Sequence, residues 1–195
     1  MKIIDISHIA QEAPIYPGSP PIQIDKVSDM QKGAHCNSSM ITAGSHMGTH
    51  ADAFTHFLKD SKIGIDKMEL SFYYGPCRVI TIPGNTLITR EDLEGRITGC
   101  TRLIIHGGGS IYLTKSAADY IVEKGIITVV TDACSIAPSG KSTEIHEAVM
   151  APGLAVVEGV ALDGVEDGDY ILCAFPIKIG GCDGAPVRAV LIAEE

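Results

Sequence analysis

The sequence contains no tryptophan, and aromatic residues make up only 5% of its 195 residues. A broad stacking surface for bases or sugars is therefore not expected, although a single Tyr or Phe could still line a pocket. Positive charge is also scarce, since 15 Lys and Arg residues face 24 Asp and Glu residues, for a formal net charge of -9. A nucleic-acid groove and an anionic membrane surface both need clustered basic side chains, so the composition argues against both as partners.

Long apolar runs are missing as well. No segment approaches the roughly 18 uncharged apolar residues of a membrane span. Asp5 and His8 interrupt the N-terminal apolar run that a secretory signal would require. The six cysteines include no Cys-x-x-Cys pair, and a chain of this length does not need disulfides, so we expect reduced thiols. These features predict a cytoplasmic protein.

The length and the 45% hydrophobic content favour one domain over residues 1–195. Strands are expected where apolar residues alternate with polar ones or run together, at 2–6, 22–27, 38–43, 78–82, 102–105, 126–131, 155–162, 170–175 and 187–192. We expect 22–27 and 38–43 to pair as an antiparallel hairpin with one face toward solvent.

Apolar residues at helical spacing predict a helix at 114–124, with Thr114 or Ser116 as the N-cap and Gly125 as the C-cap. Weaker helices are expected at 90–94 and 142–150. The helix at 114–124 separates two predicted strands, which indicates a right-handed crossover between parallel strands. The mixture of elements predicts an α/β domain with more than one sheet layer.

Histidines are concentrated in the segment 46–56, which contains His46, His50, Asp52 and His56. Imidazoles and carboxylates are the ligands that Zn²⁺, Mn²⁺ and Fe²⁺ favour. In an extended or irregular segment, His50 and Asp52 project to the same side, and Gly48 lets the backbone bend so that His46 can join them. The segment therefore predicts a metal site. The alternative is that the histidines lie on the surface and that Asp52 caps a helix beginning near Ala53.

The pattern His-x-Gly-Thr-His-x-Asp-x-x-x-His at 46–56 resembles the signature of the metal-dependent hydrolases grouped as the cyclase family, which includes bacterial kynurenine formamidases and isatin hydrolases. Further similar segments occur in the expected order along essentially the whole chain: Tyr16-Pro-Gly-Ser, Ile145-His146, Glu158, Gly168-Asp-Tyr and Asp183-Gly-Ala-Pro-Val-Arg. We accordingly expect a layered β/β/α domain of the swivelling type, with a mixed central sheet, a second smaller sheet and few helices.

The resemblance implies two divalent metal ions per subunit, with Zn²⁺ or Mn²⁺ favoured. The first ion would be held by His46, His50 and Asp52, and the second by Asp52, His146 and Glu158, so that Asp52 bridges them. A carboxylate such as Glu158 within an apolar strand is costly unless it is paired or coordinated. His56 resembles the family's proton-transfer residue, with a surface histidine or an additional metal ligand as the alternatives.

The resemblance also implies hydrolysis of a formamide or cyclic amide C–N bond by metal-activated water, as in an arylformamidase. Tyr16, in the proline-rich loop 14–21, and His106, before Gly107-Gly-Gly109, are candidate contacts for a small-molecule carbonyl substrate. Two alternatives are a metal-dependent lyase or dehydratase, which stabilises an enolate, and a non-catalytic metal-binding protein. Relatives commonly form dimers or tetramers, so we expect a homodimer or homotetramer.

Overall fold

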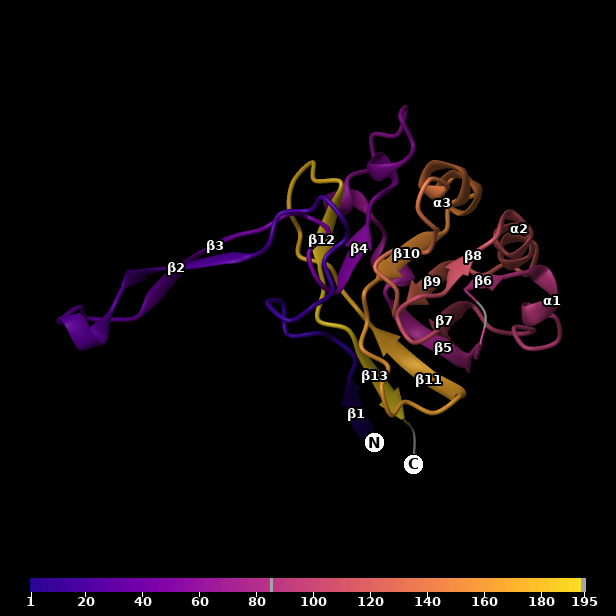
Figure 1. Cartoon of the computed structure of the whole chain (residues 1–195), viewed down its shortest axis with the longest axis horizontal. Helices are drawn as coiled ribbons and strands as arrows, with labels where there is room; N and C mark the ends of the chain where they lie inside the picture. The colour runs from indigo at the N-terminus through magenta and orange to yellow at the C-terminus, as the bar shows by residue number, and fades with distance from the viewer. Residues whose placement is uncertain (85, 194–195) are drawn as a thin grey trace.

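In the computed structural model, which describes residues 1–84 and 86–193, a nine-stranded mixed sheet forms the body of the protein (Figure 1). Its strands, in spatial order, are β1 (Lys2–Asp5), β13 (Val190–Ala193), β11 (Gly168–Cys173), β5 (Tyr74–Thr81), β7 (Arg102–His106), β9 (Thr128–Thr131), β10 (Ala155–Glu158), β4 (His50–Asp52) and β12 (Gly184–Pro186). The central strands β5, β7, β9 and β10 are parallel, and the flanking strands pair antiparallel.

The described residues also form two small sheets, β2 (Gln23–Ser28) with β3 (Ser38–Thr42), and β6 (Leu87–Ile88) with β8 (Tyr112–Leu113). The α-helices are α1 (Arg90–Leu93), α2 (Lys115–Glu123) and α3 (Ser142–Met150). Short 3₁₀ helices are η1 (Met30–Lys32), η2 (Phe54–His56), η3 (Ile65–Lys67) and η4 (Leu70–Phe72). The expected layered α/β fold with a mixed central sheet and few helices is confirmed.

The period of two along the central strands divides the core between the two faces of the sheet. In β7, Leu103 and Ile105 belong to a cluster that includes the helix residues Ala118 and Ile121, whereas Ile104 belongs to the cluster on the opposite face. The three α-helices cover one side of the sheet (Figure 1). The central strands β7 and β9 are therefore buried on both faces, as parallel strands usually are.

Helix α2 begins and ends where its capping residues predict. The Thr114 hydroxyl accepts a hydrogen bond from the Ala117 amide at 3.3 Å, so Thr114 rather than Ser116 is the N-cap. Gly125 follows the last helical turn with a φ of 73°, a conformation that costs glycine little. The strands on either side, β7 and β9, pair in parallel as expected.

Strand β10 is shorter than the predicted strand at 155–162. It ends at Glu158, because Gly159 adopts a φ of +67° and its amide donates to the Ala133 carbonyl instead of continuing the ladder. Strand β5 is longer than predicted, since Tyr74–Cys77 pair with β11. The pairing of distant segments thus decides the strand ends.

The β2–β3 hairpin extends away from the body of the protein (Figure 1). The antiparallel pairing is as predicted, but the expectation that one face would be buried is wrong. Ser28 is partly covered, and every other residue of the two strands is exposed, including Val27 at 68% and Ile41 at 65%. Within residues 1–84 and 86–193, no element buries either face of the hairpin. Among the described residues, no helix is long and apolar enough to cross a membrane.

Candidate active site

The central element of the site is β4, which lies between β10 and β12. Its three residues alternate in direction, so His50 and Asp52 face one side while Ala51 packs into the core on the other. The register pairs His50 with Glu158 of β10, which brings a second carboxylate to the same place. The helix-capping alternative for Asp52 is wrong, because η2 begins at Phe54 and its N-cap residue Ala53 makes no side-chain capping bond.

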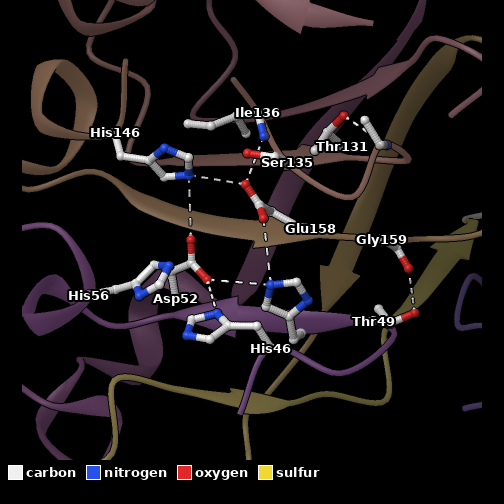
Figure 2. A network of polar contacts seen from close by, with 12 residues as sticks. His46, Thr49, Asp52, His56, Thr131, Ser135, Ile136, His146, Glu158 and Gly159 are labelled. Atoms are coloured by element: carbon white, nitrogen blue, oxygen red, sulfur yellow. Dashed lines mark hydrogen bonds and ion pairs between the residues drawn. The ribbon is translucent and has the colours of Figure 1, made fainter. Parts of the chain in front are cut away.

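Two groups of potential metal ligands share Asp52. One comprises His46, His50 and Asp52, and the other comprises Asp52, His146 and Glu158; within each group the ligand atoms lie within 4.8 Å of one another. Asp52 Oδ1 lies 2.9 Å from His46 Nδ1 and 3.5 Å from His50 Nε2, whereas Asp52 Oδ2 lies 3.7 Å from His146 Nε2. Figure 2 shows this carboxylate between the rings of His46 and His146. Each oxygen of Asp52 thus faces a different group.

Glu158 completes the second group and also approaches the first. Its Oε1 lies 3.2 Å from His146 Nε2 (Figure 2). Its Oε2 lies 3.5 Å from His50 Nε2. The Ile136 amide donates to the same Oε1 at 2.7 Å, which fixes the orientation of the carboxylate. Glu158 is therefore held in place by a backbone group.

Backbone carbonyls orient two of the three histidines. The Nδ1 of His50 lies 2.9 Å from the Gly48 carbonyl oxygen, and the Nδ1 of His146 lies 2.7 Å from the Ser142 carbonyl oxygen. A ring nitrogen that faces a carbonyl must carry a hydrogen, so in the neutral rings each Nε2 presents its lone pair to the carboxylates. This outer contact is typical of metal-ligating histidines. The donor set and its orientation fit divalent cations.

The charge balance of the site also fits cations. Asp52 and Glu158 are only 1% and 4% exposed, and buried carboxylates are costly without positive partners. Burial opposes protonation of His46, but its hydrogen bonds to Asp52 and Asp183 outweigh burial and raise its pKa to about 9. Against burial, the contacts with Glu158 and Asp52 likewise raise the pKa values of His50 and His146. The carboxylates thus attract positive charge, which bound cations would provide.

His56 lies beside these groups but outside both of them. Its ring stacks on that of His46, with 3.9 Å between the centroids, and its Nδ1 lies 3.5 Å from Asp183 Oδ2. Burial lowers the pKa of His56, which favours the neutral ring. His56 also belongs to a third group of potential ligands with His46 and Asp183, so an additional metal ligand stays an alternative to proton transfer.

A cavity of about 220 Å³ opens beside the ligand groups. It is lined by Tyr16, Ser19, His46, His50, His56, Phe57, Cys134, Ser135, Ser142, His146 and Glu158. Tyr16 therefore lies at the cavity, and Phe57 forms another aromatic wall, because its ring stacks on His146 at 4.0 Å between centroids.

Sequence reasoning assigned no role to Phe57, Cys134, Ser135 or Asp183. Cys134 and Ser135 follow the carboxyl end of the parallel strand β9, which is where α/β sheets place ligand contacts, so this signal was present in the sequence. Asp183 was noted only as the first residue of the family-like segment Asp183-Gly-Ala-Pro-Val-Arg, and no role was assigned to it.

The structure places His106 away from the cavity. It ends β7, and its Nε2 lies 3.8 Å from Asp132 Oδ2, which itself accepts hydrogen bonds from the Gly107 and Gly108 amides. His106 does not line the cavity. A substrate contact by His106 stays a prediction.

Comparisons with known proteins agree with this geometry. A family model described as a putative cyclase matches residues 4–138. A kynurenine formamidase from Maricaulis maris (strain MCS10) is 32% identical over 204 residues, which cover 97% of this chain and 97% of that protein. A solved structure described as a potential metal-dependent hydrolase with cyclase activity is 25% identical, with a TM-score of 0.82 and 99% of both chains covered.

Isatin hydrolase A from Labrenzia aggregata, solved bound to benzyl benzoate, is similar in fold. Its structure superposes with a TM-score of 0.82 over 99% of this chain and 94% of that chain, at 20% identity. At this identity the likeness supports the fold alone.

Proposed function

Because this chain belongs to the Cyclase family, we propose that residues 1–195 act as one hydrolase domain that cleaves a formamide or cyclic amide, in the manner of an arylformamidase. The chain is a metal-dependent hydrolase that acts on C–N bonds other than peptide bonds. Its similarity to a kynurenine formamidase over almost the full length supports hydrolysis over the lyase or dehydratase alternative. The observation that carries the proposal is the buried Asp52, which is shared by two ligand groups beside a cavity.

We propose two divalent ions, Zn²⁺ or Mn²⁺, one held by His46, His50 and Asp52 and one by Asp52, His146 and Glu158. When bound, such ions supply an activated water and positive charge for the substrate's carbonyl oxygen. Three imidazoles and two carboxylates suit either metal, because ligand type alone does not separate them. Because each carboxylate oxygen of Asp52 faces a different ligand group, Asp52 can be shared by both ions.

In the proposed reaction, the oxygen of water bonds to the carbonyl carbon, the C–N bond breaks, and the nitrogen leaves with a proton. His56 accepts a proton and returns it to the departing nitrogen, a role suited to a neutral imidazole. Its lowered pKa and its place on the cavity wall support this role. Tyr16 and Phe57 would contact the substrate from the aromatic walls.

The cavity dimensions bear on the substrate. About 220 Å³ is less than the roughly 300 Å³ at which pockets for drug-sized ligands begin. We therefore propose a small carbonyl compound with no more than one or two rings.

The test is a panel of formamides, cyclic amides and lactones, assayed with metal-stripped protein before and after refilling with Zn²⁺ or Mn²⁺. We expect activity to disappear on stripping, to return on refilling, and to yield formate or a ring-opened acid. Loss of water from the substrate would instead identify a dehydratase. Full metal binding without turnover of any compound would support a non-catalytic metal-binding protein.

Replacing His56 separates proton transfer from metal binding. In H56A we expect turnover to fall by about 10²–10⁴-fold while the metal content, measured by elemental analysis, stays at the wild-type value. His35 on the β2–β3 hairpin is exposed, so H35A is the matched control. If H56A lost metal together with activity, His56 would be a ligand; unchanged turnover would refute its role altogether.

We propose that copies of the chain associate, as a homodimer or homotetramer, through the β2–β3 hairpin. An isolated two-stranded hairpin is at best marginally stable in water. The cross-strand neighbours Ile24 and Ile41 are exposed, and together with Ile177 and Ile179 they line one apolar groove at the base of the hairpin. Because the projecting arm and the groove belong to the same chain, two copies can cover each other's apolar surface by one symmetric contact.

A cytoplasmic location is likewise proposed. All six cysteines are free thiols, and Cys36 alone among them is exposed rather than buried or half-buried. Free thiols persist in reducing compartments. Fractionating the source cells tests this: we expect the protein in the cytoplasmic fraction, with all six cysteines as free thiols.

A further inference from the structure

Asp183 lies between two histidines to which the proposed function gives different roles. It immediately precedes β12, and its backbone carbonyl accepts a hydrogen bond at 2.8 Å from the amide of Ala53, which follows β4. Its Oδ2 lies 3.2 Å from His46 Nε2 and 3.5 Å from His56 Nδ1. Its Oδ1 accepts a hydrogen bond from the Ser45 hydroxyl at 2.8 Å. Both oxygens of this carboxylate are thus engaged.

The three histidines of the ligand groups differ in how they are oriented. For His50 and His146, the ring nitrogen that faces away from the carboxylates is held by a backbone carbonyl. For His46, the nitrogen that faces away from Asp52 is Nε2, and its partner is the side chain of Asp183. A carboxylate that accepts from the outer ring nitrogen fixes the tautomer and the direction of the inner lone pair. Asp183 therefore does for His46 what the backbone does for the other two.

The position of His46 leaves little room for another arrangement. A Cβ atom at Gly184 would lie 2.7 Å from His46 Cε1, so the ring packs directly against the backbone of β12. On its other side, the ring stacks on His56. Because Asp183 Oδ2 faces both stacked rings, one carboxylate sets the orientation of the pair.

We propose that Asp183 is a positioning residue that holds His46 with its Nδ1 toward Asp52 and keeps His56 stacked beside it at the cavity. The proposal rests on the proposed function, in which His46 binds metal and His56 moves a proton. Asp183 itself contacts neither the reacting atoms nor Asp52. It acts through the rings of His46 and His56.

The first test compares metal binding and kinetics of wild type and D183N. We expect D183N to bind Zn²⁺ about 10–100-fold more weakly, by competition with a chromogenic chelator, with unchanged stoichiometry at saturating Zn²⁺. At saturating Zn²⁺ we expect kcat to fall and KM to change little, because the substrate contacts are not removed. Asp66 in η3 accepts a hydrogen bond from the amide of Gly181, two residues before Asp183, and contacts no histidine among the described residues. D66N is therefore the matched control. Wild-type affinity and wild-type kcat in D183N would overturn the proposal.

Loss of one equivalent of Zn²⁺ from D183N at saturating metal would also overturn the proposal, because Asp183 would then be a direct ligand. If D183N does not fold, S45A provides a milder change, since it removes only the hydroxyl that holds Oδ1. We expect S45A to weaken Zn²⁺ binding by less than D183N would, and wild-type affinity in S45A would then count against the proposal.

A double-mutant cycle separates this inference from the proposed function. If Asp183 acts on turnover through His56, D183N lowers kcat in the wild-type background but adds little in H56A. Additive losses of kcat would overturn that part of the proposal. If H56A leaves turnover unchanged, the proton-transfer role fails, while weaker Zn²⁺ binding by D183N would still establish that Asp183 positions His46.

Discussion

Two pairs of short strands differ in burial: β4 with β10 is buried, whereas β2 with β3 is exposed to solvent. Every residue of β4 and β10 is buried, including the polar residues His50, Asp52 and Glu158. In the β2–β3 hairpin nearly every residue is exposed, including the apolar Ile24 and Ile41. The protein therefore buries charge in one region and exposes apolar surface in another.

Each region departs from the usual distribution of residues in a way that points to a different partner. Buried carboxylates and imidazoles become favourable when a cation neutralises them. Exposed apolar side chains on a projecting hairpin become favourable when another protein surface covers them. A cation is therefore proposed for the first region and a second copy of this chain for the second.

The largest effect is expected from replacing Asp52 in the buried region, and it is an effect on metal binding. Asp52 faces both ligand groups, so D52N should weaken binding of both proposed metals by more than about 100-fold, beyond the usual effect of losing an outer contact. The matched control is D29N on the hairpin, where Asp29 caps η1 and pairs with Lys26. We expect D29N to retain full metal content by elemental analysis. Loss of metal from only one site in D52N would contradict the shared role of Asp52.

An intermediate effect is expected from removing the metal rather than a ligand. At free metal equal to 100 times Kd, binding stabilises the native state by about 2.7 kcal/mol, which corresponds to roughly 5–10 °C in Tm for a chain of this size. Chelation should therefore lower Tm in calorimetry and increase hydrogen exchange in β4 and β10. Exchange in β2 and β3 should stay the same. An equal increase in both regions would show that they are not independent.

The smallest effect on the stability of the body is expected from changing the hairpin surface. I24S/I41S should shift the proposed oligomer to monomers in light scattering, while the free energy of unfolding of the monomer changes by no more than about 0.5 kcal/mol. Ile3, exposed on the edge strand β1, provides the control I3S, which should keep the oligomer intact. An unchanged mass for I24S/I41S would refute the hairpin contact.

Local sequence was a good guide wherever the determining interactions are themselves local. The spacing of His50 and Asp52 predicted their common direction, because alternation is a property of any extended strand. Thr114 and Gly125 predicted the two ends of α2 for the same kind of reason. The burial of β2 and β3 could not be predicted from their alternation, because it depends on whether another element packs against them.

The metal-ligand candidates show the same division. His146 and Glu158 were linked to the histidine segment by resemblance to a family and not by their spacing. The structure brings them to Asp52 because β10 pairs with β4 and α3 packs beside β10. Asp183 was assigned no role, since its meaning depends on β12 lying against the other edge of β4.

By itself, the sequence determined the chemical character of this protein: a dense set of imidazoles and carboxylates on a bent, extended segment, within an acidic α/β chain. The tertiary structure alone decided that Asp183 lies against His46 and that the β2–β3 hairpin stands uncovered, and it brought together the two ligand groups around Asp52 that the family resemblance had implied. The physical reason is that residue type and strand period act over a few neighbouring residues. Charge pairing and burial, in contrast, depend on segments that meet only when the sheet has formed.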